Sequence, residues 1–198
     1  PVTVRFNTFK ATEDEIISQL GNIKAEKSLL LENCYELDGG DVTATDAFKN
    51  GLLHVQDKAS QLCCRALNPT ADDKVLDLCS APGGKTFTMA EMMNGKGEIY
   101  ACDLHEKRVK LIADGAKRLG LENIKTMAAD ASVYNEKLPK FSKILCDVPC
   151  SGLGVIRRKP EIKYKNPSDF EGLPTIQYKI AENALNYLEV GGEMVYST

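Results

Sequence analysis

The sequence predicts an α/β protein in which a parallel sheet with helices on both faces follows a smaller α+β module. Short apolar runs alternate with helical patterns from Asp57 onward, as they do in successive β-α-β units. The preceding residues contain strand patterns and one capped helix, without that regular alternation. A length of 198 residues allows one medium domain or a small domain joined to a larger one. We therefore expect a small module over residues 1–52 and a larger domain over residues 53–198.

The small module is expected to begin with a strand. Residues 2–8, VTVRFNT, alternate apolar and polar side chains, which predicts that strand. A helix is expected in TEDEIISQL, because Thr12 and Glu15 have the spacing of a capping box. SLLLENCYEL resembles a second strand, and DGGDVTATDAF indicates a linker that contains turn signals.

The larger domain is expected to begin with a helix over DKASQLCCRAL, which NPT ends. Its strands are predicted in KVLDLC, EIYACD, IKTMAAD, KILCDV and GEMVYS. Helices are expected to begin near Lys85, Glu106, Ser132 and Thr175. In such sheets a ligand binds at the carboxyl ends of the strands, near the switch in strand order. The residues that follow these strands therefore form the candidate site.

Composition excludes several classes of protein. Hydrophobic residues make up 43% and charged residues 27% of the chain, and no apolar run is long enough to cross a bilayer. Seven cysteines in no regular framework, without a signal peptide at the start, indicate a soluble protein of the reducing cytoplasm. The chain starts at Pro1 and stops where an apolar strand has barely finished, so we expect a fragment.

The distribution of charge is uneven. A net charge of −3 does not attract polyanions to the molecule as a whole, so nucleic-acid binding would have to rest on a local patch. The run RRKPEIKYK, residues 157–165, contains five basic side chains and one acidic side chain. Taken alone, this run fits a solvated loop as well as it fits a nucleic-acid contact.

The segment LDLCSAPGGKT, residues 76–86, predicts a strand, a tight turn and the start of a helix. Its ending suggests a P-loop, but Cys79 stands where that motif needs a glycine and Pro82 lacks a backbone N–H for a phosphate. The spacing G-x-G-x-x-G of dinucleotide sites is missing too. Gly83 and Gly84 still let a ligand approach the backbone closely. A tight turn without a ligand is the alternative.

Three aspartates end the strands that follow. Asp103 lies 19 residues after Gly84, where a carboxylate can accept hydrogen bonds from both ribose hydroxyls of a nucleoside. Asp130 could accept from an adenine amino group, and Asp147 faces the same crevice. Each of them alone is more typical of a helix cap or a solvated turn. Together they favour a nucleoside without phosphates, and S-adenosylmethionine, with its cationic sulfonium, fits that requirement.

Four segments together resemble the Sun/RsmB branch of RNA cytosine-5 methyltransferases, namely LDLCSAPGGKT, ACD, AAD and CDVPCSGLGVIRRKPEIKY. VRFNT resembles that family's entry into a small RNA-recognition-like domain, and VQDKASQ resembles its junction with the catalytic domain. The resemblance implies a Rossmann-like class I methyltransferase domain that depends on S-adenosylmethionine and lacks its C-terminal strands here. The predicted cofactor-binding residues are Cys79, Ser80, Ala81, Pro82, Gly83, Gly84, Lys85, Asp103, Asp130 and Asp147.

The resemblance also implies that two cysteines divide the chemistry. In the family a thiolate adds to carbon 6 of cytosine, because carbon 5 is a poor nucleophile until the aromaticity of the ring is broken. Cys150 matches the cysteine that helps to release the product, and the attacking cysteine would follow Thr198. Asp147 would hold the amino edge of the cytosine, and Lys85 would face the reaction centre, where a cation could lower the pKa of a thiol. A metal site at Cys146 and Cys150 is disfavoured, because no Cys-x-x-Cys pair or histidine accompanies them.

The predicted RNA contacts follow the same motif. Arg157, Arg158 and Lys159 could hold phosphates at the rim of the pocket, and Tyr164 could stack on a base. We expect methylation of a cytosine in structured RNA, and the resemblance of GVIRRKPEIKY favours 16S ribosomal RNA of the small subunit. Three alternatives stay open: a transfer-RNA cytosine-5 methyltransferase, a non-catalytic RNA-binding protein with a degenerate cofactor site, and a nucleotide-dependent dehydrogenase.

Overall fold

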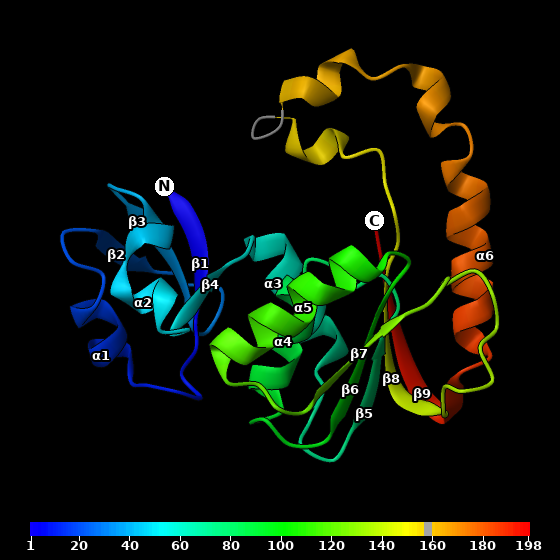
Figure 1. Cartoon of the computed structure of the whole chain (residues 1–198), viewed down its shortest axis with the longest axis horizontal. Coiled ribbons are helices and arrows are strands. Elements are labelled where there is room, and N and C mark those ends of the chain that lie inside the picture. Colours follow the sequence, from blue (N-terminus) through cyan, green and yellow to red (C-terminus); the bar gives the residue numbers. More distant parts are fainter. Residues whose placement is uncertain (157–159) are drawn as a thin grey trace.

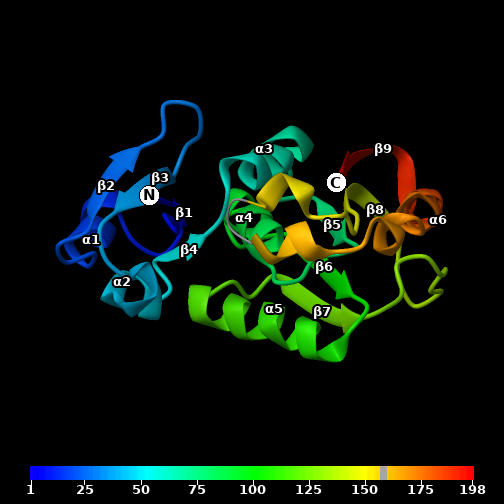
Figure 2. The same ribbon diagram turned by 90° about the horizontal axis from the view of Figure 1, so that it is seen from above.

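Two sheets organise the chain, one in each module. The structure is a computed structural model that describes residues 1–156 and 160–198 (Figure 1). Within these residues, the N-terminal sheet has four strands in the order β2-β3-β1-β4, and the larger sheet has five in the order β7-β6-β5-β8-β9. The N-terminal module lies at one end of the long axis of the molecule, beside the larger domain, in both views (Figures 1 and 2).

The N-terminal sheet is antiparallel throughout. Its strands are β1 (Val2–Phe6), β2 (Lys24–Lys27), β3 (Cys34–Asp38) and β4 (Leu53–Val55). Helix α1 (Glu13–Ser18) starts at the predicted capping box: Thr12 Oγ1 accepts from Glu15 N at 3.3 Å, and Glu15 Oε2 accepts from Thr12 N at 2.8 Å. The first strand and this helix are confirmed.

Two predictions for the module are wrong. A strand is predicted over residues 28–37, but β3 starts only at Cys34, since Leu30 N donates to Ser28 Oγ at 3.2 Å in a local turn. Residues 38–48 are predicted as a linker, but they contain a 3₁₀ helix, η1 (Val42–Ala44), and the start of α2 (Asp46–Lys49). The side chains of Asp41 and Thr45 accept backbone hydrogen bonds at the starts of these two elements and so stabilise them.

Strand β4 links the modules. It pairs antiparallel with β1, with Val4 opposite Val55, although residues 53–55 fall in the larger domain under the predicted division. Gln56 N also donates to Thr3 O at 3.1 Å, which carries the contact with the N-terminal sheet to the start of the next helix. The division at residues 52 and 53 stays a prediction.

The larger sheet is parallel at every strand pair described. Its strands are β5 (Lys74–Asp77), β6 (Glu98–Asp103), β7 (Ile124–Ala128), β8 (Phe141–Asp147) and β9 (Leu188–Ser197). The helices of this domain are α3 (Lys58–Leu67), α4 (Gly84–Met92), α5 (Glu106–Leu119) and α6 (Leu173–Leu185). All five predicted strands are therefore confirmed, as are the helices predicted to begin near Lys85, Glu106 and Thr175.

Helices cover both faces of this sheet, as predicted (Figures 1 and 2). On one face, Val75 and Leu145 pack with side chains of α3, α4 and α5. On the other face, Leu76 and Ile144 pack with side chains of α6. Successive residues of a strand point to opposite faces, which is why neighbours such as Val75 and Leu76 enter different cores.

No helix begins near Ser132, contrary to the prediction. Residues 129–140 connect β7 and β8 without helical structure. Asp130 Oδ1 accepts from Ser132 N at 2.9 Å and from Ser132 Oγ at 2.7 Å, and this local turn competes with helix formation. Further along, Asn135 N donates to the hydroxyl of Tyr187 at 2.6 Å, which fixes the connection against the sheet.

The connection between β8 and α6 passes over the carboxyl edge of the larger sheet (Figure 1). Its described part contains three short 3₁₀ helices, η2 (Leu153–Val155), η3 (Pro160–Tyr164) and η4 (Pro167–Phe170). Over residues 1–156 and 160–198, no helix is long and apolar enough to cross a membrane.

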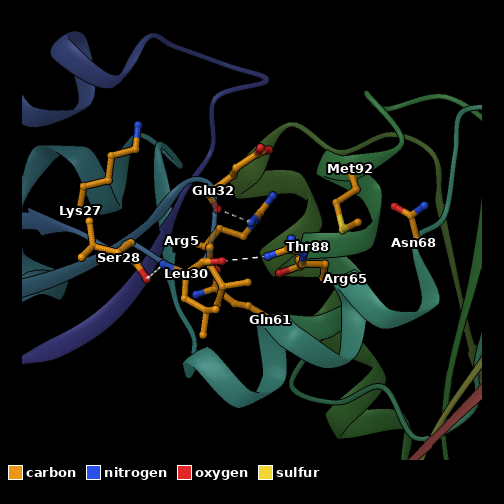
Figure 3. Close-up of a pocket in the computed structure, with 12 residues that line it drawn as sticks. Arg5, Lys27, Ser28, Leu30, Glu32, Gln61, Arg65, Asn68, Thr88 and Met92 are labelled. Carbon is orange, nitrogen blue, oxygen red and sulfur yellow. Dashed lines mark hydrogen bonds between the residues drawn. The ribbon is translucent and has the colours of Figure 1, made fainter.

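Buried polar contacts join the two modules. Arg5 Nε on β1 donates to Glu91 Oε2 on α4 at 2.6 Å, and both side chains are less than one tenth exposed. Asn7 Nδ2 donates to Leu119 O at the end of α5 at 2.8 Å. A cavity of about 500 Å³ lies at this junction, with Arg5 and Thr88 among its lining residues (Figure 3). The N-terminal sheet is thus held against α4 and α5.

Candidate functional site

One cavity collects the predicted strand-end residues. It has a volume of about 540 Å³ and lies at the carboxyl ends of β5, β6, β7 and β8. Its lining includes Cys79, Asp103, Asp130, Asp147 and Cys150. The strand order switches direction at β5, which lies between β6 and β8. The residues that line the cavity therefore follow strands on both sides of this switch point.

The turn after β5 is fixed by backbone hydrogen bonds. Ser80 N donates to Cys102 O at 2.8 Å, and Gly83 N donates to Ser80 O at 2.7 Å. Gly83 has φ of 109°, and a Cβ at this position would lie 2.3 Å from the ring of Phe87, so a side chain here would clash. The tight turn therefore brings the backbone of residues 79–84 to the edge of the cavity and starts α4 directly behind it.

Asp103 is held in place at the end of β6. Its side chain is 3% exposed, and Oδ2 accepts from Ala81 N at 3.2 Å. Arg108 lies 3.3 Å from Asp103 Oδ1 and also donates to Ala81 O at 2.9 Å, so one guanidinium joins the strand end to the glycine-rich turn. Sequence reasoning missed Arg108. The available signal was a basic residue one turn into the helix that follows the aspartate.

Asp130 differs from the other two aspartates because it is exposed. Its side chain accepts both hydrogen bonds from Ser132, and these bonds lower the pKa of the Asp130 carboxyl from its ordinary value. The carboxylate is therefore charged at neutral pH and stays at the rim of the cavity, where it presents a hydrogen-bond acceptor.

Asp147 lies between two partners at the end of β8. Lys85 Nζ is 2.6 Å from Asp147 Oδ2, and Ser197 Oγ donates to Asp147 Oδ1 at 2.6 Å. Burial of Lys85 opposes its charge, but the hydrogen bond and charge of Asp147 outweigh burial and raise the pKa of the lysine overall. Lys85 is thus a fixed cation whose partner is a carboxylate. Sequence reasoning missed Ser197, which lies 50 residues from Asp147 on the neighbouring strand.

A second, smaller cavity adjoins the first on the Lys85 side. It has a volume of about 200 Å³ and shares Cys79, Ala81 and Asp147 with the larger cavity. Asp77 also lines it, and the sequence analysis did not identify this residue, because it lies inside an apolar strand pattern. Asp77 is 1% exposed, and burial raises the pKa of its carboxyl to about 7.

Asp77 also has an unsatisfied oxygen. Its Oδ2 accepts from Thr86 Oγ1 at 2.7 Å, whereas Oδ1 is buried and has no hydrogen-bond partner among the residues that the structure describes. A buried polar atom without a partner is costly, so such atoms are typical of sites where a ligand supplies the missing bond. Asp77 Oδ1 is therefore an unused hydrogen-bond acceptor beside the smaller cavity. When the carboxyl is protonated on this oxygen, Oδ1 is an unused donor.

The cysteines divide by exposure. Cys150 is exposed in the larger cavity, on the turn after β8. Cys146 is buried, and burial raises the pKa of its thiol to about 12. Burial likewise raises the pKa of Cys79, which is half-buried at both cavities. Cys150 is therefore the most accessible thiol of these three cysteines.

Of the four predicted RNA contacts, the structure describes Tyr164 alone. Arg157, Arg158 and Lys159 are outside the described residues. Tyr164 in η3 is 90% exposed and is not among the residues that line either cavity. As for metals, no group of three or more His, Cys, Asp or Glu in the described parts of the chain is arranged to hold an ion.

Comparisons with known proteins agree with this geometry. The family model described as 16S rRNA methyltransferase RsmB/F matches residues 64–198. The probable ribosomal RNA small subunit methyltransferase B of Bacillus subtilis (strain 168) is 43% identical over 99% of this chain and 45% of its own length. The 25S rRNA (cytosine-C(5))-methyltransferase NSUN5 of Arabidopsis thaliana is 35% identical over 100% of this chain and 37% of its own length. This chain thus spans less than half the length of these two curated relatives.

A solved structure extends the similarity to the whole fold. The crystal structure of a methyltransferase homologue protein from Pyrococcus horikoshii superimposes with a TM-score of 0.84 at 29% sequence identity. The match covers 99% of this chain and 64% of the solved chain. Both modules are therefore part of the shared architecture.

Proposed function

The chain belongs to the 16S rRNA methyltransferase RsmB/F family, and from this premise we propose that it methylates carbon 5 of a cytosine in ribosomal RNA with S-adenosylmethionine as donor. The observation that carries the proposal is the single cavity that collects Asp103, Asp130 and Asp147 beside the glycine-rich turn. Its volume of about 540 Å³ is in the range of small-molecule sites.

The residues of the cavity fit this cofactor. Three carboxylates would repel a pyrophosphate, whereas they suit a neutral nucleoside and a cationic centre. Asp103, fixed by Ala81 and Arg108, accepts from the ribose hydroxyls, and Asp130 at the rim accepts from the adenine amino group. The bound cofactor would supply an electrophilic methyl group on a sulfonium.

The other cavity residues act on the target base. Asp147 is oriented by Lys85 and Ser197, so its carboxylate is preorganised to hold the cytosine amino group. Cys150 is exposed in the same cavity and helps to release the methylated product. The base enters beside Lys85, where the smaller cavity meets the larger one at Asp147, and it must leave its stack to reach these groups.

Two features of the relatives support the choice of substrate. The names of the Bacillus and Arabidopsis relatives both specify ribosomal RNA, and the matched family model specifies 16S rRNA. We therefore propose 16S rRNA of the small subunit as the substrate of the full-length protein.

Calorimetry with S-adenosylmethionine tests the cofactor assignment directly. The chain should bind S-adenosylmethionine and should not bind nicotinamide adenine dinucleotide, because its turn lacks the dinucleotide spacing. Asp103→Ala should weaken binding by about 1.5–3 kcal/mol, since it removes hydrogen bonds to a charged acceptor. Asp114→Ala, an exposed aspartate on α5 outside the cavity, is the matched control and should bind as the unaltered chain does. Unchanged affinity in Asp103→Ala would reject the assigned role.

A further inference from the structure

Gln56 is a buried polar side chain at the junction of the modules that has no role in the preceding assignments. It follows β4 and precedes α3, and its side chain is among the buried polar groups at 6% residue exposure. It lines the smaller cavity together with Gly84, Lys85 and Asp147. It is therefore a residue of the N-terminal sheet's last connection that reaches the candidate reaction centre.

The orientation of the Gln56 carboxamide is set by Thr88 on α4. Thr88 Oγ1 donates to Gln56 Oε1 at 2.6 Å. The same hydroxyl lies 3.1 Å from Gly84 O, but it has only one proton, and the shorter contact takes it. With Oε1 engaged by Thr88, the amide nitrogen is at the other end of the planar group.

That nitrogen has no partner. Gln56 Nε2 is buried and makes no hydrogen bond within residues 1–156 and 160–198. Nε2 and Cγ of Gln56 both lie 3.7 Å from where a Cβ on Gly84 would stand, and Gly84 lines the same cavity. Burying an amide N–H without an acceptor is costly, so the position favours a ligand that brings one.

The charges around the cavity narrow the class of acceptor. Asp57, Asp77 and Asp147 line it, and the one lysine of the lining, Lys85, is already paired with Asp147, so the cavity favours a neutral acceptor over an anionic phosphate group. A neutral acceptor, such as a carbonyl oxygen or a ring nitrogen, meets no repulsion from these carboxylates. A pyrimidine base offers both on one edge, and its flat ring suits a cavity of about 200 Å³.

We propose that Gln56 binds the target nucleotide by donating a hydrogen bond from Nε2 to the acceptor edge of the pyrimidine base in the cavity beside Lys85 and Asp147. The inference deepens the proposed function, on which it rests. Thr88 then acts as a positioning residue, because it touches the carboxamide and not the base. Gln56, two residues before the start of α3, thereby couples the N-terminal sheet, through Thr3, to recognition of the base.

The test measures the binding of cytidine 5′-monophosphate to the whole chain. Binding is monitored by ligand-observed NMR in the presence of S-adenosylhomocysteine. Gln56→Met should weaken binding of the nucleotide about tenfold, the effect of losing one buried hydrogen bond. Gln19→Met is the control, because Gln19 is a partly buried carboxamide of the N-terminal module that lines neither cavity of the candidate site. The control should bind the nucleotide within twofold of the unaltered chain.

A second variant separates binding from mere packing. Thr88→Val should weaken nucleotide binding by less than Gln56→Met does, and it should add nothing in the Gln56→Met background. Should Gln56→Met fail to fold, Gln56→Glu replaces it, because that change keeps the acceptor and removes the Nε2 donor. Affinity for S-adenosylmethionine should stay within twofold in all of these variants.

Several outcomes would overturn the assignment of Gln56. These are nucleotide binding within twofold of the unaltered chain in Gln56→Met, an equal loss in Gln19→Met, additive losses in the double variant, and no binding of the nucleotide by the unaltered chain. The failure of the proposed function has a different signature, which is that the unaltered chain does not bind S-adenosylmethionine.

Discussion

The buried carboxyl of Asp77 makes the stability of the protein depend on pH in an unusual direction. Burial raises the pKa of this group from 3.8 to about 7, with a smaller contribution from the charge of Asp147 and an opposing hydrogen bond from Thr86. The folded chain therefore holds the proton more tightly than the unfolded chain does. The contribution of this proton to the free energy of unfolding is fully present below the pKa of Asp77 in the unfolded chain. It is lost as pH rises through the pKa of Asp77 in the folded chain.

The size of the effect follows from the two pKa values. A rise from 3.8 to about 7, at about 1.4 kcal/mol per pH unit, corresponds to about 4 kcal/mol in total between a pH below the unfolded pKa and a pH above the folded pKa. Asp77→Asn removes the titration and keeps both the shape of the side chain and an acceptor for Thr86. The free energy of unfolding of the unaltered chain, minus that of the variant, should therefore fall by about 4 kcal/mol over this interval.

Urea unfolding of both chains at half-unit steps from about pH 3 to about pH 8 measures this difference, because contributions from all other groups cancel in the subtraction. Asp73→Asn is an informative control with the opposite sign. Asp73 is partly buried, but hydrogen bonds from Thr70 and Ser142 lower the pKa of its carboxyl overall, so its stabilising effect is present at neutral pH and lost in acid. A flat difference curve for Asp77→Asn, or an Asp77 carboxyl resonance that titrates near pH 4, would refute the reasoning.

Two further predictions concern stability. Glu91→Gln should lower the free energy of unfolding by about 3–5 kcal/mol, because it leaves the buried guanidinium of Arg5 without its partner at 2.6 Å. Replacement of both residues by Met should cost less than the single change in urea unfolding, and equal losses would contradict the role of the ion pair. Ile144→Ala should cost about 2–5 kcal/mol, because Ile144 is fully buried in the sheet. Val190→Ala, at an exposed position on β9, should change stability by less than about 0.5 kcal/mol, and a similar effect at both sites would contradict the assigned core.

Local patterns sufficed where the forces that form an element act between near neighbours. The capping box of Thr12 and Glu15 predicted α1, since both of its hydrogen bonds span three residues. The alternation of apolar runs and helical patterns predicted the parallel sheet. The same local logic explains the failure near Ser132, where a turn around Asp130 satisfied the backbone in place of a helix.

Part of the candidate site was also predictable, because strand ends in a parallel sheet meet at one edge. Asp103, Asp130 and Asp147 were identified as the ends of predicted strands and Cys150 from its resemblance to a family motif, and all four line one cavity. Their roles in binding and catalysis stay proposals. Arg108 and Ser197 escaped notice, because neither belongs to a motif and each becomes relevant only through the aspartate that it contacts.

The sequence by itself determined which residue types follow each strand and on which face of the sheet each apolar side chain is buried. Only the tertiary structure decided which of them are neighbours: Lys85 and Asp147 are 62 residues apart, and Asp147 and Ser197 are 50 apart. The reason is the strand order, which places β8 between β5 and β9 and is set by packing of whole layers. Burial also depends on the tertiary structure, because segments distant in sequence exclude water from a side chain. The raised pKa of Asp77 and the buried amide nitrogen of Gln56, which has no partner among the described residues, both result from such burial.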